Sequence, residues 1–335
     1  MNHMMNDRIR RYIPRCLLHT GRAILRDGKY ALRYPRFLRV QPAFTPRVHA
    51  ERKGEDTTIA PFLVGTSSGL LLYERGAFIR VCGGKIYGIT LDEKGACCIF
   101  QRLPESFGRL VRFDLNTGQA RTLADFLSTG IHQIDWVDSR LAVTDTYRNA
   151  IRLYSPRGRL LEVHHPNGRL PDGRNSDNYR HFNSVFRSGQ DIYLVAHNWS
   201  QKTGRFSQIY RLDRNWKVRE VLSTRSRSAH NVVCLDGEMW HCGSLDGTLV
   251  RGRRTVFRDE RYFTRGLAVN HEHILLGGSE FAERENRSTS SAVVMVLNGE
   301  GKEMLRYRLI GCGDVFEIRF LQNDLALSGQ GDVFA

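Results

Sequence analysis

The stretch HQIDWVDSRLAVTDTYRNAIRLYSPRGRLLEV, residues 132–163, decides the fold. It holds short runs rich in Val, Ile, Leu and Tyr, and polar residues with Asp, Ser, Asn or Gly separate these runs. Such a pattern predicts short β-strands joined by turns. Helical segments that could carry crossover connections are missing between the runs, so the pattern disfavours a parallel sheet.

The same unit recurs along the chain. Copies start at Phe62, Lys85, His132, His181, His230 and Arg265, and a partial copy starts at Phe316. From residue 132 onward the starts lie 49 (132 to 181), 49 (181 to 230), 35 (230 to 265) and 51 (265 to 316) residues apart. A repeat of roughly 40–50 residues with about four short strands is typical of a β-propeller. We therefore expect an all-β propeller over residues 57–335, with seven blades as the first choice and six as the second.

The repeat form resembles bacterial propellers of the NHL and SMP-30-like type. The resemblance covers roughly residues 57–335 and includes hairpins such as LVGTSSGLLLYERG, residues 63–76. The regular Trp-Asp ending of WD40 repeats is missing, and so is a kelch Gly-Gly doublet in every copy. Propellers of this broad type include metal-dependent hydrolases and lyases as well as binding scaffolds, so the resemblance leaves the function open.

Composition excludes several classes of protein. The chain has 335 residues, of which 41% are hydrophobic and 25% charged, as in an ordinary globular protein. Uninterrupted apolar stretches of about 20 residues, which a membrane-spanning helix requires, are missing. The seven cysteines are odd in number and form no CxxC pair, so neither a disulfide framework nor a cysteine-based zinc site is favoured. We expect a cytoplasmic location.

Positive charge is concentrated near the N-terminus. Residues 1–60 carry 13 Lys and Arg against 5 Asp and Glu, a net +8 of the total +15. Apolar residues are interleaved with the charges, so residues 1–45 are expected to form a basic helical extension, broken near Pro14 and Pro35. Such a segment could lie on an anionic membrane surface, bind an acidic partner, or pack as an ordinary solvated helix. Nucleic acid is the less favoured partner, because no nucleic-acid module follows.

The alignment of the repeats exposes one chemical feature. When the second strands are placed in register, the first strands start at His132, His181, His230, Arg265 and Phe316. The first strand of each propeller blade is the innermost, so equivalent starts should converge at one mouth of the central channel. Three imidazoles and one guanidinium are therefore expected to meet there, and these four residues are the predicted catalytic residues.

Several interpretations of this cluster stay open. His132, His181 and His230 could bind one divalent transition metal and leave an open coordination position for substrate. Without a metal, a histidine could act as general acid or base while Arg265 neutralises a substrate carboxylate or phosphate. The cluster could also bind an anion without chemistry, or each His could simply cap its own strand.

Long polar loops near the same mouth supply further candidates. Predicted substrate-binding residues are Tyr179, Arg180, Asn183, His197, Asn231 and Glu280. Asn198 belongs to the same group, and Asp135, Asp314 and Glu317 are carboxylates that could complete a metal site or share a proton.

Two functions follow from these features. The first is an enzyme of lyase or hydrolase type that acts at the channel mouth on an anionic substrate, for which an acidic saccharide is one class. The second is a non-catalytic binding or scaffold propeller, attached to a membrane surface or an assembly partner through its basic N-terminus.

Overall fold

A computed structural model describes residues 45–321 except 56, 93–94, 105–106, 116–118, 169–179 and 284. The expected N-terminal helical extension therefore lies outside the described residues, as does Tyr179. In the part of the chain that is described, no helix has both the length and the apolar character needed to cross a membrane.

The described residues form six antiparallel sheets, which we number as blades 1–6. Blades 2–5 each contain four strands that are consecutive in sequence. From the inner to the outer strand, blade 2 consists of β6 (Lys85–Leu91), β7 (Cys97–Arg102), β8 (Gly108–Phe113) and β9 (Ala120–Leu127), and blade 3 of β10 (Ile131–Val137), β11 (Arg140–Asp145), β12 (Ala150–Tyr154) and β13 (Leu160–His164). Blade 4 consists of β14 (Phe182–Ser188), β15 (Asp191–Ala196), β16 (Gln208–Leu212) and β17 (Val218–Ser223). Blade 5 consists of β18 (Ala229–Leu235), β19 (Glu238–Gly243), β20 (Thr248–Arg251) and β21 (Arg254–Arg258).

Blades 1 and 6 each have five strands, because segments from the two ends of the described chain join them. Blade 6 consists of β22 (Tyr262–Val269), β23 (Ile274–Glu280), β24 (Ala292–Leu297) and β25 (Glu303–Leu309), with β2 (Ala50–Gly54) on its outer edge. Blade 1 has β26 (Val315–Phe320) as its inner strand, followed by β3 (Phe62–Thr66), β4 (Gly69–Glu74), β5 (Ala77–Gly83) and β1 (Thr45–Arg47).

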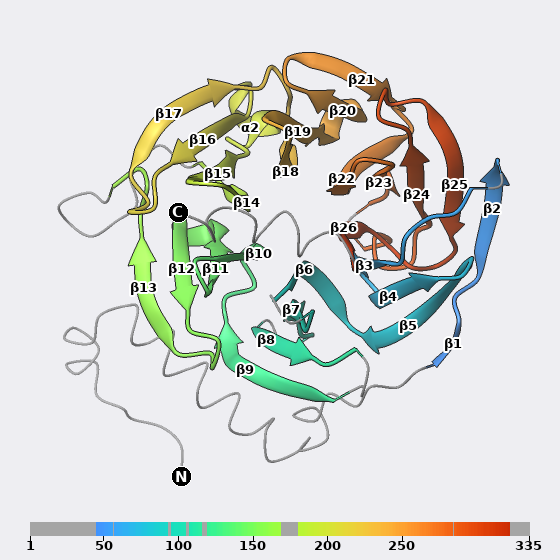
Figure 1. Cartoon of the computed structure of the whole chain (residues 1–335), viewed down its shortest axis with the longest axis horizontal. Helices are drawn as coiled ribbons and strands as arrows, with labels where there is room; N and C mark the ends of the chain where they lie inside the picture. The colour runs from blue at the N-terminus through green and yellow to red at the C-terminus, as the bar shows by residue number, and fades with distance from the viewer. Residues whose placement is uncertain are drawn as a thin grey trace, which may run out of the picture. The chain divides into compact units, whose positions relative to one another are not determined.

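The blades form a closed ring, and the first choice of seven blades is wrong (Figure 1). Each inner strand contacts the next one, and β22 contacts β26, which itself contacts β6. The seven-blade prediction counts the copies that start at Phe62 and Phe316 as two separate blades. They are parts of one sheet, because β26 pairs with β3 from Val315↔Thr66 to Phe320↔Phe62. The six-bladed propeller, which was the second choice, is the observed architecture.

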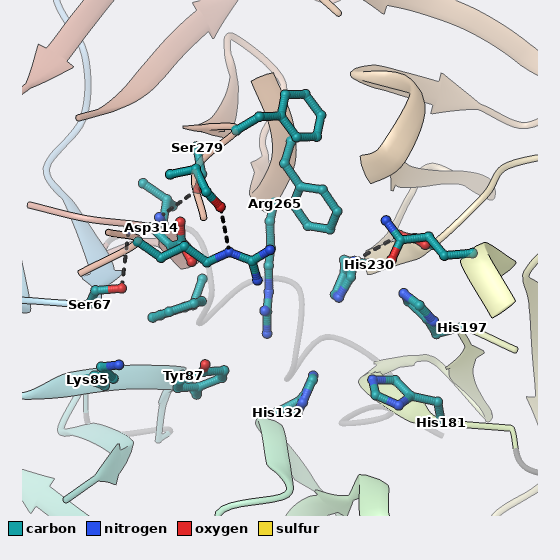
Figure 2. Close-up of a pocket in the computed structure, with 18 of the residues that line it drawn as sticks. Ser67, Lys85, Tyr87, His132, His181, His197, His230, Arg265, Ser279 and Asp314 are labelled. Atoms are coloured by element: carbon teal, nitrogen blue, oxygen red, sulfur yellow. Dashed lines mark hydrogen bonds between the residues drawn. The ribbon is translucent and has the colours of Figure 1, made fainter. Parts of the chain in front are cut away.

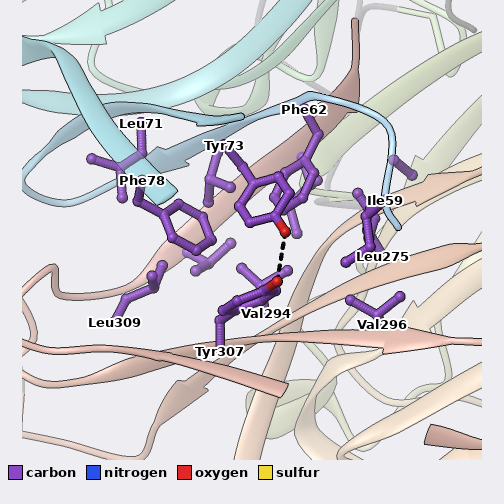
Figure 3. Close-up of a cluster of buried hydrophobic side chains, with 14 of the residues drawn as sticks. Ile59, Phe62, Leu71, Tyr73, Phe78, Leu275, Val294, Val296, Tyr307 and Leu309 are labelled. Atoms are coloured by element: carbon purple, nitrogen blue, oxygen red, sulfur yellow. Dashed lines mark hydrogen bonds between the residues drawn. The ribbon is translucent and has the colours of Figure 1, made fainter. Parts of the chain in front are cut away.

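Burial decreases from the middle of each blade to its rim. All residues of β3 and β24 are buried, whereas four of the five residues of the outer strand β13 are exposed. This gradient explains why the middle strands read as continuous apolar runs, since both of their faces pack against neighbouring blades. One such interface joins blades 1 and 6, where Phe62, Phe78 and Tyr307 pack together (Figure 3). In it, the hydroxyl oxygens of Tyr73 and Tyr307 lie 2.6 Å apart in a hydrogen bond.

A register shift occurs at the same place in all six inner strands. The pairing of each inner strand with its neighbour is interrupted near the first strand residues, for example between Ile131 and Ile134 and between His230 and Val232. A β-bulge of this kind bends the strand and re-aims a side chain. In blade 6 the bulge includes Gly266 at φ +87, where an added Cβ would lie 2.9 Å from Val315 of the adjoining inner strand. The bulges thus turn side chains toward the mouth of the channel while the inner strands stay closely packed.

Candidate functional site

A cavity of about 590 Å³ lies where the inner strands begin (Figure 2). Side chains from all six blades surround it. They include Phe316 of blade 1, Tyr87 of blade 2, His132 of blade 3, His181 and His197 of blade 4, His230 of blade 5, and Arg265 of blade 6. The structure therefore brings together the four side chains predicted to be catalytic, together with His197 from the predicted substrate-binding set. Their roles stay predictions.

Four imidazoles occupy one side of the cavity. The ring centroids of His132 and His181 are 5.0 Å apart, those of His181 and His197 are 4.7 Å apart, and those of His197 and His230 are 5.2 Å apart. His132 and His230 face each other at 6.5 Å with nearly parallel rings. Residues up to 98 positions apart in sequence (132 to 230) thus form one continuous group of rings.

The inner-strand bulges explain how these side chains reach the cavity. His132 and Arg265 lie within the bulges of β10 and β22, and His230 directly precedes the shift in β18. Blade 4 has its bulge at the equivalent place, Asn183, but its histidine differs, because His181 precedes the strand. His181 has a left-handed backbone with φ 55, and its backbone N–H donates to Asn149 of blade 3. An anchored local distortion therefore places the ring of His181 beside the others.

Hydrogen bonds assign different tautomers to two of these rings. Nδ1 of His230 lies 2.9 Å from the carbonyl oxygen of Ser228, which can only accept, so this nitrogen carries the proton and Nε2 has a free lone pair. The backbone N–H of Trp199 donates to Nδ1 of His197 at 3.1 Å, so neutral His197 carries its proton on Nε2. The cavity thus contains one imidazole that presents an acceptor and another that presents a donor.

Burial keeps the imidazoles neutral. It lowers the pKa of His230 and that of His132 well below the usual value, and the positive charge of Arg265 lowers them further. Burial and then His197 lower the pKa of His181 to about 2, and burial and then Arg265 lower the pKa of His197 to about 4. At neutral pH the imidazoles are therefore uncharged, and their lone pairs can accept a hydrogen bond or bind a ligand.

Cations and aromatic rings form the other side of the cavity. The rings of Tyr87 and Phe316 stack with their centroids 3.9 Å apart. The guanidinium carbon of Arg102 lies 3.4 Å from the Tyr87 ring centroid, and that of Arg265 lies 5.0 Å from the Phe316 ring centroid. These distances are within the range of cation–π contacts, which hold both arginines against the aromatic pair.

Arg265 is a buried cation without a direct counter-ion among the described residues. Its side chain is 8% exposed and projects into the cavity (Figure 2), and burial lowers the pKa of its guanidinium. Asp314 and Glu317 act on it only at longer range, and neither forms an ion pair with it. A charge buried in this way is costly unless a partner of opposite sign approaches it, so the cavity suits an anion.

A polar layer lies directly beneath the imidazoles. Glu317 accepts hydrogen bonds from Nε2 of Gln133 at 2.6 Å and from Nδ2 of Asn231 at 3.2 Å. Oδ1 of Asn231 in turn accepts from the backbone N–H of Gly266 at 2.8 Å. Each of these four residues directly follows a cavity residue in the chain, so the layer connects the strands that carry His132, His230, Arg265 and Phe316. Burial raises the pKa of Glu317 to about 7, although Arg319 opposes the shift.

The other predicted substrate-binding residues have varied positions. Glu280 lines the cavity and approaches Arg308 at 3.3 Å. Arg180 is half-buried and is not among the residues around the cavity. Asn183 is buried and donates to the carbonyl of Ala229, which joins blades 4 and 5. Asn231 belongs to the polar layer beneath the site.

The loop and carboxylate candidates can be placed in the same way. Asn198 donates to the carbonyl of Phe206 and to Gln208, so its side chain stabilises its own loop. Asp314 lines the cavity, and burial raises its pKa. Asp135 lies further along its strand, where it accepts from Thr90, and burial raises its pKa as well.

Several cavity residues escaped the sequence interpretation. Tyr87 and Arg102 come from blade 2, whose inner strand carries no histidine, so the histidine register gave no reason to select them. Aligning Tyr87 with His132 and Arg265 as bulge positions would have found it. Trp199 and Lys202 in the loop after β15, and Phe281 in the loop after β23, also line the cavity. The sequence interpretation selects only polar residues from these loops, so it misses them.

The described side chains do not form a ready metal centre. No group of three or more His, Cys, Asp or Glu among them is placed so that it could hold a metal ion. Arg265 also adds a positive charge that would repel a cation. The metal role of His132, His181 and His230 stays a prediction.

Comparisons with known proteins agree on architecture. The fold is similar to that of a chain from a nidogen/laminin complex (10% identity, TM-score 0.58), and the match covers 78% of this chain and 97% of that one. It is also similar to a protein of unknown function from Bacteroides caccae (10% identity, TM-score 0.53, covering 78% and 98%). A third similar structure is a protein from Lactobacillus plantarum (11% identity, TM-score 0.53, covering 78% and 99%). No protein-family model and no curated protein matches the sequence. At these identities the likeness shows the fold alone, and that fold is the β-propeller.

Proposed function

We propose that the protein is an enzyme of lyase or hydrolase type that binds an anionic substrate in the cavity at the channel mouth. The observation that carries this proposal is the buried guanidinium of Arg265, which projects into the cavity without a direct counter-ion among the described residues. A substrate carboxylate or phosphate would supply that counter-ion and form charge-assisted hydrogen bonds with it.

The neutral imidazoles suit proton transfer beside the bound acid group. Nε2 of His230 has a free lone pair and acts as the general base, since its other nitrogen is fixed by the Ser228 carbonyl. In a lyase reaction it takes a proton from the carbon next to the carboxylate. A carbon–carbon double bond forms as the carbon–oxygen bond breaks, and the departing oxygen receives that proton. In a hydrolase reaction the same nitrogen takes the proton from the attacking water.

Two further groups support the same step. Arg265 stabilises the negative charge that develops on the carboxylate oxygens during proton removal. Nε2–H of His197 is a neutral donor that can bond to the departing oxygen, because its Nδ1 already accepts from Trp199. Such charge stabilisation in a buried site is commonly the largest contribution to enzymatic rate enhancement.

The experiment combines binding and turnover. The wild type, Arg265→Met, His230→Gln and the control Arg253→Met, an exposed arginine outside this cavity, are titrated with acetate and inorganic phosphate by calorimetry. They are then screened against oligouronates for the absorbance of an unsaturated product and for reducing ends. Arg265→Met should lose at least tenfold in anion affinity, whereas His230→Gln should keep affinity and lose turnover. Equal anion affinity of Arg265→Met and wild type would refute the proposal.

A metal-dependent form of this chemistry is the second candidate mechanism. The hydrogen bond from Nδ1 of His230 to a backbone carbonyl favours it, because metal-binding histidines are commonly oriented in this way. Elemental analysis of protein purified without an affinity tag should then give about one transition metal per chain. His181→Ala with His230→Ala should remove the metal and leave the ring folded, and unchanged metal content in that variant would contradict this mechanism.

A non-catalytic propeller remains the alternative proposal for the whole chain. The net charge of +8 in residues 1–60 supports attachment to an anionic membrane surface or acidic partner through residues 1–45. Vesicles with and without anionic lipid provide the test. Deletion of residues 1–40 should abolish vesicle binding, and retention of binding would contradict the proposed attachment.

A further inference from the structure

Aromatic side chains form the outer part of the cavity. Phe281 lies in the long loop after β23, is 55% exposed and lines the cavity. Its ring is edge-to-face with that of Phe263 at 6.3 Å, and Phe263 is edge-to-face with His230 at 5.5 Å. A continuous series of rings therefore leads from the proposed base to solvent.

A second aromatic residue approaches from the neighbouring blade. Trp199 lines the same cavity from the loop after β15, and its ring lies 5.8 Å from that of His181. Its backbone is left-handed with φ 48, a conformation that bulky residues rarely adopt. The short helix α2 (Ser200–Thr203) holds it there, since Lys202 and Thr203 both donate to the Trp199 carbonyl. Strain maintained in this way is a feature of functional sites.

The cavity thus has an inner part and an outer part whose side chains differ in chemistry. Its inner part contains Arg265 and Arg102 against the Tyr87–Phe316 pair, so the charge of a ligand is attracted inward. The more exposed part of its lining contains Phe281 and Trp199, and the ammonium of Lys202 lies 3.8 Å from the Trp199 ring centroid. Exposed Lys85 and Arg287 line the cavity as well. A simple inorganic anion on the two arginines would be too small to reach the Phe281 ring as well, whereas a larger acid could contact both.

We propose that the substrate is an acid whose carboxylate is carried by a ring, with the carboxylate on Arg265 and the ring face on Phe281 and Phe263. This inference rests on the proposed function, because it concerns the same cavity. Apolar ring faces pack well on aromatic side chains, and both a sugar ring and an aryl ring present such a face. Phe281 and Phe263 are then specificity-determining residues, and they would favour ring acids over open-chain acids of similar size.

Calorimetry with matched probes tests the inference. The probes are acetate, hexanoate, cyclohexanecarboxylate, benzoate and glucuronate, and the proteins are the wild type, Phe281→Ala, Phe281→Tyr and Phe206→Ala. Phe206 is the matched control, because it is 52% exposed and is not among the residues around the cavity. Wild type should bind at least one ring acid about three- to tenfold more tightly than both open-chain acids.

The variants separate the ring site from the anion site. Phe281→Ala should remove the preference for ring acids without changing acetate affinity, whereas Phe281→Tyr and Phe206→Ala should retain it. Tighter binding of glucuronate assigns a sugar ring, and tighter binding of benzoate or cyclohexanecarboxylate assigns an apolar ring. If hexanoate binds as tightly as the ring acids, or if Phe281→Ala keeps the preference, the inference is overturned while the anion site stands. If no acid binds, both this inference and the proposed function fail.

Discussion

At the scale of single residues, the carboxyl group of Glu317 connects the chemistry of the cavity to the stability of the ring. It is 1% exposed, and its hydrogen bonds reach Gln133 and Asn231 on two other blades. Because burial raises its pKa to about 7, the group releases its proton in the folded state only near neutral pH. The unfolded chain releases it near the ordinary value for Glu.

Glu317→Gln should change the pH dependence of stability. A raised pKa in the folded state contributes stability that is present below about pH 4.5 and is lost as the pH rises to about 7. The shift corresponds to at most about 3 kcal/mol. Denaturant titrations from pH 5 to pH 8 should show the variant gaining stability relative to wild type as the pH rises. A constant difference across that range would contradict the assignment.

The two assigned tautomers give a spectroscopic prediction. At pH 6, nitrogen-15 spectra of the side chains should show His230 protonated on Nδ1 and His197 protonated on Nε2, because a carbonyl faces one ring and an N–H faces the other. Both rings should be neutral, since burial lowers both pKa values. The Ser244 hydroxyl also lies 2.9 Å from Nδ1 of His230, but a hydroxyl can donate or accept. Ser244→Ala should therefore leave the His230 tautomer unchanged, because the Ser228 carbonyl by itself requires it. Identical tautomers in the two residues would contradict the proposed division of roles.

Sequence reasoning found the chemically distinctive part of the site and missed the rest. His132, His230 and Arg265 could be found because they occupy equivalent places in strands whose apolar pattern can be aligned. The pattern also selects His181, although this residue lies before its strand, because its imidazole still reaches the cavity from there. The histidine pattern does not select Tyr87, although Tyr87 occupies the equivalent bulge position of its strand. Arg102 has no such signal in the sequence, because only the fold brings it into cation–π contact with Tyr87.

At the scale of the elements, packing between neighbouring sheets depends on a few polar contacts within apolar surroundings. The hydrogen bond between Tyr73 of β4 and Tyr307 of β25 lies in the apolar interface of blades 1 and 6 (Figure 3). Burial raises the pKa of Tyr307, and the contact with Tyr73 raises it further, so the hydroxyl stays protonated and can donate. The contact therefore fixes how one blade lies against the next.

A double-mutant cycle at this pair measures its contribution. Tyr73→Phe and Tyr307→Phe should each lower the free energy of unfolding by about 1 kcal/mol, because each leaves one buried hydroxyl without this partner. The double variant should lose less than the sum, since neither hydroxyl remains. Denaturant unfolding at pH 7 provides the measurement. Strict additivity would show that the two hydroxyls do not interact in solution.

The blade count shows where sequence periodicity fails. The copy at Phe62 contains second, third and fourth strands, whereas the seven-blade prediction counts it as a separate blade. Its missing strand is β26, more than 240 residues away (62 to 315). Local patterns of apolar residues predict strands well, because each strand must bury its own faces. Pairing between strands at the two ends of the described chain is a long-range contact, and a local pattern of apolar residues contains no information about it.

At the scale of the whole molecule, strand β26 closes the ring. It pairs with β3, packs against β22 and β6, and supplies both Phe316 to the cavity and Glu317 to the polar layer. Without it, the inner edge of β3 would present unpaired backbone groups, which is an unfavourable state for a buried strand. The addition of β26 therefore closes the ring and completes the cavity at the same time.

Removal of residues 315–335 should open the ring. Thermal unfolding followed by tryptophan fluorescence should become less cooperative, and the midpoint should fall by several degrees. Added peptide VFEIRFL, residues 315–321, should restore a single sharp transition by adding a strand to β3. The same peptide with Ile318→Asp should not, because Ile318 is fully buried between blades. Equal rescue by both peptides would argue against strand addition.

The late position of β26 in the chain also bears on protein synthesis. A ribosome must translate residues 315–320 before the cavity can be complete, so nascent chains that already contain its four histidines still lack Phe316 and the closing strand. Binding at the proposed site would then begin only after these six residues have been made and have paired with β3. A message truncated before codon 315 would yield all four cavity histidines on a ring that is still open.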